Sequence, residues 1–222
     1  AFPQNMLMQL AVTTSLATII ATSLSATYVH DRKRAVLWAP VRRIAPGLLI
    51  GASLGALLAD FVSSGVLRIV FGLFEILVGI QMWLNFKPKA HSALPGTLGL
   101  VSSGFGIGLL STLMGIGGGT LTVPFLLWCN INMRNAVAVS SACGFPIAVA
   151  ATIALVIVGW NEEAIPAHSL GYLYWPAAII ISAMTILFAP LGARLAHYLP
   201  IVILKRIFSV LLVMVGTQML VS

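Results

Sequence analysis

The sequence predicts an all-α protein: a polytopic transmembrane helical bundle of two inverted repeats, with a glycine-broken helical hairpin in the second repeat only. Three observations predict this fold. The 222 residues are 59% hydrophobic and only 8% charged, with a mean hydropathy of +1.05, whereas about a quarter of the residues of a soluble domain are charged. Two parts of the chain repeat each other, and a cluster of glycines interrupts one apolar segment at its centre.

Seven apolar stretches approach or exceed the roughly 20 residues with which a helix crosses a bilayer. The net charge of +7 would suggest a nucleic-acid partner in a soluble protein. Here the charges sit in short loops between the stretches, so they indicate membrane topology instead. The two cysteines are too few for a disulfide framework and are expected to pack. The stretches are 6–28, 44–61, 66–86, 97–128, 135–160, 172–193 and 201–222, in a single transmembrane domain, 1–222.

The chain contains two copies of one unit, at 6–86 and 97–222. "ASLGALLA" at 52–59 matches "APLGARLA" at 189–196 in six of eight positions, and the same offset of 137 aligns 67–84 with 204–221. Only the second copy opens with the glycine segment. Either the first copy has lost that segment or the sequence is a fragment, and the absence of an initial Met favours a fragment.

The distribution of Lys and Arg among the loops predicts the orientation of each copy in the membrane. If all seven stretches crossed the membrane once, the loops on alternate sides would hold seven and five Lys or Arg. If the glycine segment instead enters and returns on one side, eleven lie on one side and only Arg68 on the other, which is the positive-inside pattern. The two copies are then inverted, and Glu162 and Glu163 lie on the external face. The eleven residues are Arg32, Lys33, Arg34, Arg42, Arg43, Lys87, Lys89, Arg134, Arg194, Lys205 and Arg206.

The glycine segment "GIGGG" is expected to form the tip of a hairpin whose arms are 97–114 and 120–129. Irregular backbone at membrane depth is tolerated where protein buries it or water reaches it, which suggests a binding site. The start of the returning helix offers free N–H groups and a partial positive charge to an anion. The alternative is that the glycines only allow close helix packing. The candidate residues are Gly115, Gly117, Gly118, Gly119, Thr120 and Pro124.

These motifs resemble the TauE/SafE family of sulfite-exporter-type membrane transporters. The resemblance rests on "GIGLLSTLMGIGGGTLTVPFLL" (106–127), on "NAVAVSSACGFPIAVAA" (135–151) and on the repeated "LGA" pattern. It implies a transporter of two related halves, whose family members are linked to sulfite, thiosulfate and organosulfur anions. This sequence departs from the pattern in lacking the first glycine segment.

Four hydroxyl residues are further candidates for contact with an anion. Ser140 and Ser141 follow the hairpin, and Thr14 and Ser15 lie on the helix that the repeat makes equivalent. The alternative is that these hydroxyls bond to their own helix or aid packing. Glu75 is a carboxylate inside a span, which suggests proton coupling, or a protonated or paired group within the bundle.

The sequence also offers a formal G-x-S-x-G motif at 51–55. No histidine lies mid-span to serve as a base, and Gly47, Gly51 and Gly55 form a ladder typical of helix packing. The histidines show no metal-ligand spacing, so no metal and no cofactor are expected.

We therefore expect a secondary transporter of a small, sulfur-containing anion. It would be a multi-pass protein of the cytoplasmic (inner) membrane that works by alternating access, with the lipid bilayer around it, a possible homo-oligomeric state and no nucleic-acid partner. Two alternatives remain open: a membrane-embedded enzyme that uses Ser53 or Cys143, and a non-transporting membrane scaffold.

Overall fold

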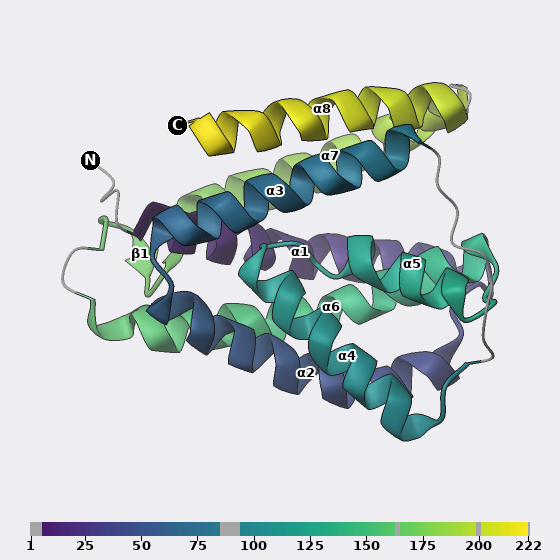
Figure 1. Cartoon of the computed structure of the whole chain (residues 1–222), viewed down its shortest axis with the longest axis horizontal. Helices are drawn as coiled ribbons and strands as arrows, with labels where there is room; N and C mark the ends of the chain where they lie inside the picture. The colour runs from purple at the N-terminus through teal and green to yellow at the C-terminus, as the bar shows by residue number, and fades with distance from the viewer. Residues whose placement is uncertain (1–5, 85–93, 163–164, 199–200, 222) are drawn as a thin grey trace.

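The structure is a computed structural model that describes residues 6–84, 94–162, 165–198 and 201–221 (Figure 1). It is helical apart from one short β-hairpin. The helices are α1 (Leu7–Arg32), α2 (Trp38–Phe61), α3 (Ser64–Trp83), α4 (Thr97–Leu113), α5 (Gly119–Trp128), α6 (Met133–Val158), the 3-10 turn η2 (Gly159–Asn161), α7 (Trp175–Tyr198) and α8 (Ile201–Val221). The hairpin strands are β1 (Ser169–Leu170) and β2 (Leu173–Tyr174).

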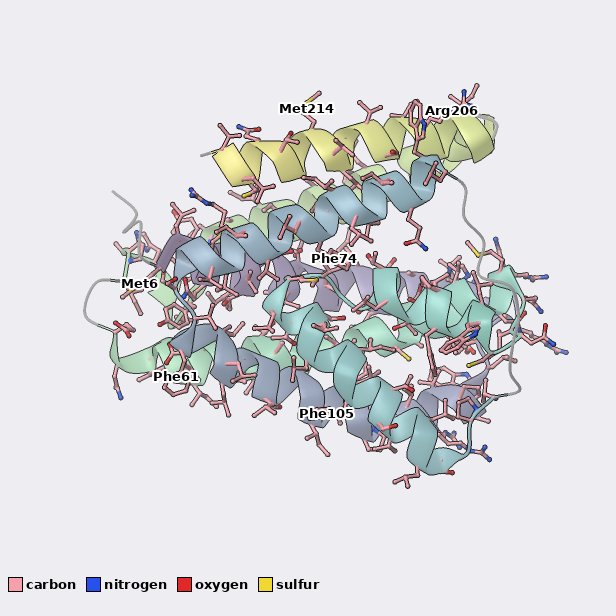
Figure 2. All side chains as sticks on the ribbon, in the orientation of Figure 1. Met6, Phe61, Phe74, Phe105, Arg206 and Met214 are labelled. Carbon is pink, nitrogen blue, oxygen red and sulfur yellow. The ribbon has the colours of Figure 1, made fainter. Side chains whose placement is uncertain are left out.

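Four helices among the described residues are long and apolar enough to cross a membrane: α1, α2, most of α3, and α6 with η2. Large apolar side chains cover the outer surface of the helices, as Phe61 on α2 and Met214 on the shorter apolar helix α8 illustrate (Figure 2), with 86% and 64% of their surface exposed. Apolar surface of this extent on long apolar helices is typical of contact with lipid. The all-helical transmembrane fold that the sequence predicts is confirmed.

The second apolar stretch begins earlier than we expected. We predicted 44–61, whereas α2 begins at Trp38 and includes Arg42 and Arg43 in its first turns. Pro40 is compatible with the first turn of a helix, where its missing N–H is not needed. Arginines near the end of a span extend their charge to the membrane interface, so they need not end the helix.

The two ends of the bundle differ in charge. In Figure 1 the α1–α2 turn, the start of α4 and the end of α5 lie at the right-hand end, while the α2–α3 turn and the β-hairpin lie at the left. The outer ends of both hairpin arms, opposite the tip that joins them, thus lie at the same end of the bundle. The segments at that end contain Arg32, Lys33 and Arg34 where α1 passes into the α1–α2 turn, Arg42 and Arg43 in the first turns of α2, and Arg134 at the start of α6, whose guanidinium donates to the carbonyl oxygen of Lys33; Figure 2 shows Arg206 at the same end. Lys87, Lys89 and Glu163, and the side chains of Arg194 and Lys205, lie outside what the structure describes.

The core is centred on α1, α2, α4 and α6. Helix α2 packs along α4 and α6, α1 packs along α6 and α7, and α5 lies on α6. Helices α3 and α8 pack against each other, with α3 also touching α1. Fully buried side chains from these helices include Leu16, Leu48, Leu100, Leu126 and Ile147. The hairpin arms are therefore held by two different helices, α4 by α2 and α5 by α6.

The β-hairpin is hydrogen-bonded to α1 and α2 at the left-hand end of the bundle in Figure 1. The hydroxyl of Tyr172 donates to Asp60 Oδ1 on α2 at 2.8 Å, and the backbone N–H of Tyr174 donates to Thr14 Oγ1 on α1 at 3.2 Å. Burial raises the pKa of Tyr172, and its hydrogen bond to Asp60 raises it further. The phenol therefore stays protonated and remains a donor at neutral pH.

Candidate functional site

The glycine segment forms the tip of a hairpin. Helix α4 ends at Leu113 and α5 begins at Gly119, close to the predicted arms. Gly115 and Gly118 have φ angles of +63° and +77°, in the left-handed region that glycine enters without a Cβ clash. The backbone reverses here because two of its residues adopt conformations that other residues rarely adopt.

Helix α5 begins without a side-chain cap. Gly118 occupies the N-cap position, and no side chain accepts a hydrogen bond there. The first N–H groups of a helix have no intrahelical partner, so those of Gly119, Thr120 and Leu121 point out from the start of α5. The aligned peptide dipoles add a partial positive charge at the same place.

The tip lies where α1 and α6 come close to each other. A Cβ added at Gly117 would stand 2.5 Å from Cγ2 of Ile19 on α1, and one added at Gly144 on α6 would stand 3.0 Å from the carbonyl oxygen of Gly117. Ser15 on α1 donates its hydroxyl to the carbonyl oxygen of Gly115 at 3.1 Å. Side chains larger than hydrogen at Gly117 would therefore separate the tip from α1.

Two buried hydroxyls border Gly118, one from each arm of the hairpin. The position of a Cβ on Gly118 is 3.5 Å from Thr122 Oγ1 and 3.7 Å from Ser111 Oγ. Thr122 and Ser111 are 0% and 1% exposed, and neither hydroxyl has a hydrogen-bond partner within the described structure. On α6, the buried Ser140 has its Oγ 3.7 Å from the Cβ position of Gly119.

Sequence reasoning missed Ser111 and Thr122. A signal for Thr122 was present, since residues four apart on a helix share a face and Thr122 follows the N-cap Gly118 by four. Nothing in the sequence indicated Ser111, because its approach to Gly118 depends on how the turn at 114–118 reverses. Ser140 was proposed from the sequence, and the structure brings it to the tip.

Two of the other proposed hydroxyls, those of Ser141 and Thr14, are engaged within their own helix or elsewhere. Ser141 donates to the carbonyl oxygen of Val137, one turn earlier, at 3.0 Å. Thr14 accepts from the backbone of Tyr174 and so belongs to the contact with the β-hairpin. Thr120 and Pro124 are half-buried within α5.

Glu75 lies at a different helix pair from the tip. It is half-buried on α3, and its Cβ is 3.2 Å from the Cβ position of Gly216 on α8. The structure therefore does not bring the carboxylate together with the residues of the hairpin tip.

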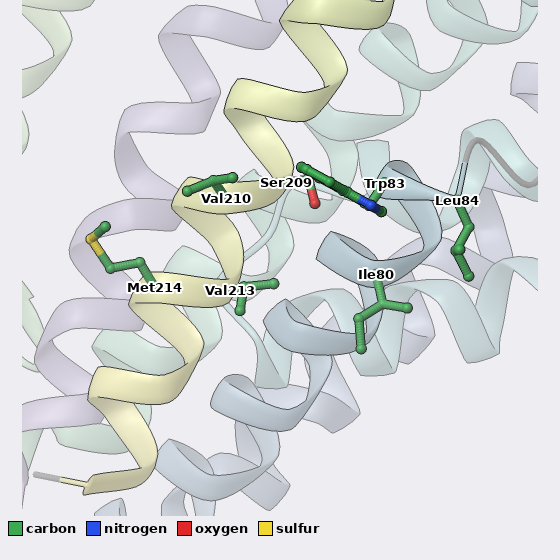
Figure 3. A pocket seen from close by; sticks show the side chains of 7 residues that line it. All are labelled: Ile80, Trp83, Leu84, Ser209, Val210, Val213 and Met214. Atoms are coloured by element: carbon green, nitrogen blue, oxygen red, sulfur yellow. The ribbon is translucent and has the colours of Figure 1, made fainter.

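A pocket of about 400 Å³ opens between α3 and α8 (Figure 3). Its lining is mostly apolar: the polar groups of the lining side chains are the indole N–H of Trp83 and the hydroxyl of Ser209, which donates to the carbonyl oxygen of Gly79 at 2.6 Å. A lining that is mostly apolar suits a hydrocarbon chain better than an anion. The remaining lining residues are Ile80, Trp83, Leu84, Val210, Val213 and Met214.

The chemistry available at the tip is hydrogen-bond donation without charged side chains. Neither α4 nor α5 contains a Lys, Arg, Asp or Glu. In the described part of the chain, no group of three His, Cys, Asp or Glu residues could hold a metal ion. Backbone N–H groups and hydroxyls can surround an oxyanion and replace the hydrogen bonds that it makes to water.

Comparison with known proteins gives the context of this site. Residues 2–219 match the family described as "Sulfite exporter TauE/SafE". A protein of Haemophilus influenzae, named "Probable membrane transporter protein", is 30% identical over 98% of this chain and 83% of its own length. No solved structure matches the chain significantly.

More distant relatives carry similar names. The Bacillus subtilis "Probable membrane transporter protein YunE" is 24% identical over 98% of this chain and 82% of its own length. The Comamonas testosteroni "Probable inner membrane transporter protein TsaS" is 26% identical over 84% of this chain and 73% of its own length. The similarity thus extends over both repeats and the glycine hairpin.

Proposed function

The chain belongs to the sulfite exporter TauE/SafE family, and we propose that it moves a small, sulfur-containing anion across the cytoplasmic membrane by alternating access. Membership makes it a multi-pass membrane transporter of the sulfite-exporter type and not an enzyme, so the alternative that used Ser53 or Cys143 is set aside. Its location in the inner membrane is inferred from the printed name of the Comamonas relative.

The observation that carries the proposal is the uncapped start of α5 beside buried hydroxyls without partners. A buried hydroxyl that makes no hydrogen bond costs about 1–3 kcal/mol. Two such groups at one helix N-terminus are explained if an oxyanion binds there and accepts from both. Sulfite, thiosulfate and sulfonates all present oxygen atoms that can accept in this way.

A two-fold relation between the repeats supports alternating access. A Cβ at Gly72 would stand 2.9 Å from the carbonyl oxygen of Gly216, while Ser209 donates to the carbonyl oxygen of Gly79. At the repeat offset of 137, Gly72 is equivalent to Ser209 and Gly79 to Gly216. The repeat thus exchanges the two contacts, which is the pattern of a two-fold interface between antiparallel helices. We propose on this basis that the two repeats are inverted, an arrangement in which one half can rock against the other.

Transport in proteoliposomes tests the proposal. Purified protein is reconstituted, and the movement of sulfite, thiosulfate and a short sulfonate is measured against that in protein-free liposomes and against chloride. We expect at least one of the three anions to move faster with protein than without it. If none does, in either direction of the gradient and at several pH values, the proposed function is wrong.

Glu75 is our candidate for coupling transport to protons. A carboxylate within a membrane span is energetically costly, and the ionisable residues that occur there commonly take part in proton or ion transport. Glu75→Gln keeps the size of the side chain and removes its ionisation. We expect the variant to lose the dependence of transport on a pH gradient while it still binds substrate. A pH profile identical to that of the wild type would remove Glu75 from the mechanism.

A further inference from the structure

We infer that Ser111 and Thr122 bind the substrate directly, one from each arm of the hairpin, and that Ile147 restricts the site to compact oxyanions. This inference rests on the proposed function, since it names the ligand groups and the size limit of the same site. Neither residue was among the candidates that the sequence suggested.

The two hydroxyls are the best-placed donors at the tip. Both border the position above Gly118, and both are completely enclosed by protein. In membrane helices such hydroxyls commonly donate to a carbonyl of the preceding turn, as Ser141 does. Ser111 and Thr122 do not, so their donor capacity remains available to a ligand between the arms.

The helix terminus makes these hydroxyls suitable for an anion in particular. The N–H groups at the start of α5 and the dipole of that helix favour negative charge beside Thr122. Because neither hairpin arm carries a charged side chain, the hydrogen bonds of neutral donors must hold the substrate. The loss of one donor should therefore have a large effect on affinity.

Ile147 limits the size of what can bind. Its Cδ1 atom is 2.5 Å from the Cβ position of Gly118, and the side chain is 0% exposed on α6. The methyl group therefore fills the position beside Gly118 that the two hydroxyls border, and a ligand there must displace it. An oxyanion that carries an alkyl chain would need this space, whereas a compact anion such as sulfite needs less of it.

Conservative variants test the two hydroxyls. Ser111→Ala and Thr122→Val remove a hydroxyl with little change in shape, and Thr122→Ser restores it. The matched control is Thr112→Val, since Thr112 is equally buried and also without a partner within the described structure, but it faces Gly55 on α2. We expect KM for sulfite to rise about tenfold in the first two variants, and to remain within about twofold of wild type in Thr122→Ser and Thr112→Val.

Binding is read separately from transport as the thermal stabilisation of purified protein by sulfite. We expect sulfite to stabilise the wild type and Thr112→Val, but not Ser111→Ala. If wild type transports anions while all variants share its KM and stabilisation, the inference fails and the proposed function stands. A wild-type protein that neither carries nor is stabilised by any tested anion contradicts both.

The size limit is tested with Ile147→Val, which removes one methyl group. We expect the ratio of methanesulfonate to sulfite transport to rise at least threefold. Leu155→Val is the control, because Leu155 is fully buried on the same helix two turns away. An unchanged ratio in Ile147→Val, or an equal change in both variants, would overturn the role of Ile147.

Discussion

Glycine has two different roles in and after helix α4: close packing of α4 against α2, and reversal of the backbone in the hairpin tip that follows α4. Along α2, glycines of both helices alternate: a Cβ at Gly55 would stand 2.7 Å from the carbonyl oxygen of Leu109, and one at Gly104 would stand 2.5 Å from that of Ile44. Cβ atoms at Gly47, Gly51 and Gly108 would also collide with backbone carbonyl oxygens of the facing helix. We name this contact the α2–α4 seam.

The tip differs from the seam in conformation and in hydrogen bonding. All seam glycines lie in regular helix, whereas Gly115 and Gly118 have positive φ angles. In the seam, the backbone N–H and C=O groups form the regular hydrogen bonds of their own helices. The tip instead combines an uncapped helix start with two hydroxyls that lack hydrogen-bond partners. Small residues alone therefore indicate packing, and a binding site needs free donors in addition.

The largest effect is expected from Gly51→Leu in the seam. The side chain would meet the backbone of Phe105, so α2 and α4 must separate, at a cost of about 3 kcal/mol or more. We expect little folded protein in membranes, measured as monodisperse protein after detergent extraction. Gly65→Ala is the control, because no heavy atom lies within 4 Å of its Cβ position. Normal yield of Gly51→Leu would contradict the seam.

A smaller but more local effect is expected from Gly118→Ala at the tip. A Cβ at a φ of +77° costs about 1–2 kcal/mol, and it would also collide with Ile147. We expect folded protein that melts several degrees lower and loses most of its anion transport.

Gly119→Ala is the matched control for this substitution. It lies one residue further on, has ordinary helical backbone, and its nearest neighbour is Ser140 Oγ at 3.7 Å. We expect near-normal melting and transport from it. Equal transport by Gly118→Ala and Gly119→Ala would mean that the conformation of the tip does not matter for function.

A similar serine-to-glycine hydrogen bond occurs at the tip and at a third region, the contact between α3 and α8, which allows a direct comparison. Ser15 donates to the carbonyl oxygen of Gly115 at the tip, and Ser209 donates to that of Gly79 between α3 and α8. Substitution of either by Ala should lower the free energy of unfolding by about 1 kcal/mol. We expect transport to fall in Ser15→Ala alone, and a similar fall in Ser209→Ala would argue against a special role for the tip.

The smallest effect is expected from Ser141→Ala. Its hydroxyl donates to Val137 within α6, and such a bond adds little to a helix. Melting temperature and KM should both stay within experimental error of wild type. A change in KM would support the prediction from the sequence that Ser141 contacts the substrate.

The sequence predicted the membrane class, the positions of most helices and the hairpin break, because each depends on local composition. Long apolar runs require helices in lipid, and four glycines in five residues cannot continue a helix at low cost. The boundary of α2 was missed because arginines at a membrane interface are compatible with helix.

The hydroxyls of the candidate site show what local pattern cannot reveal. Thr14, Ser15, Ser140 and Ser141 looked alike in the sequence, yet only Ser15 and Ser140 reach the tip. Which of them do so depends on the rotation of α1 and α6 about their axes, and that rotation is fixed by packing along the whole helix.

The sequence by itself determined that this chain lies in a membrane and reverses its backbone at 115–119. Only the tertiary structure decided which side chains surround that reversal. Ser111 approaches Gly118 because two positive φ angles fold α5 back beside α4, and Ile147 approaches it because α5 packs on α6. Insertion into the lipid depends on the hydrophobicity of each segment, which can be read along the sequence. A binding site depends instead on distances between residues that are remote in the chain.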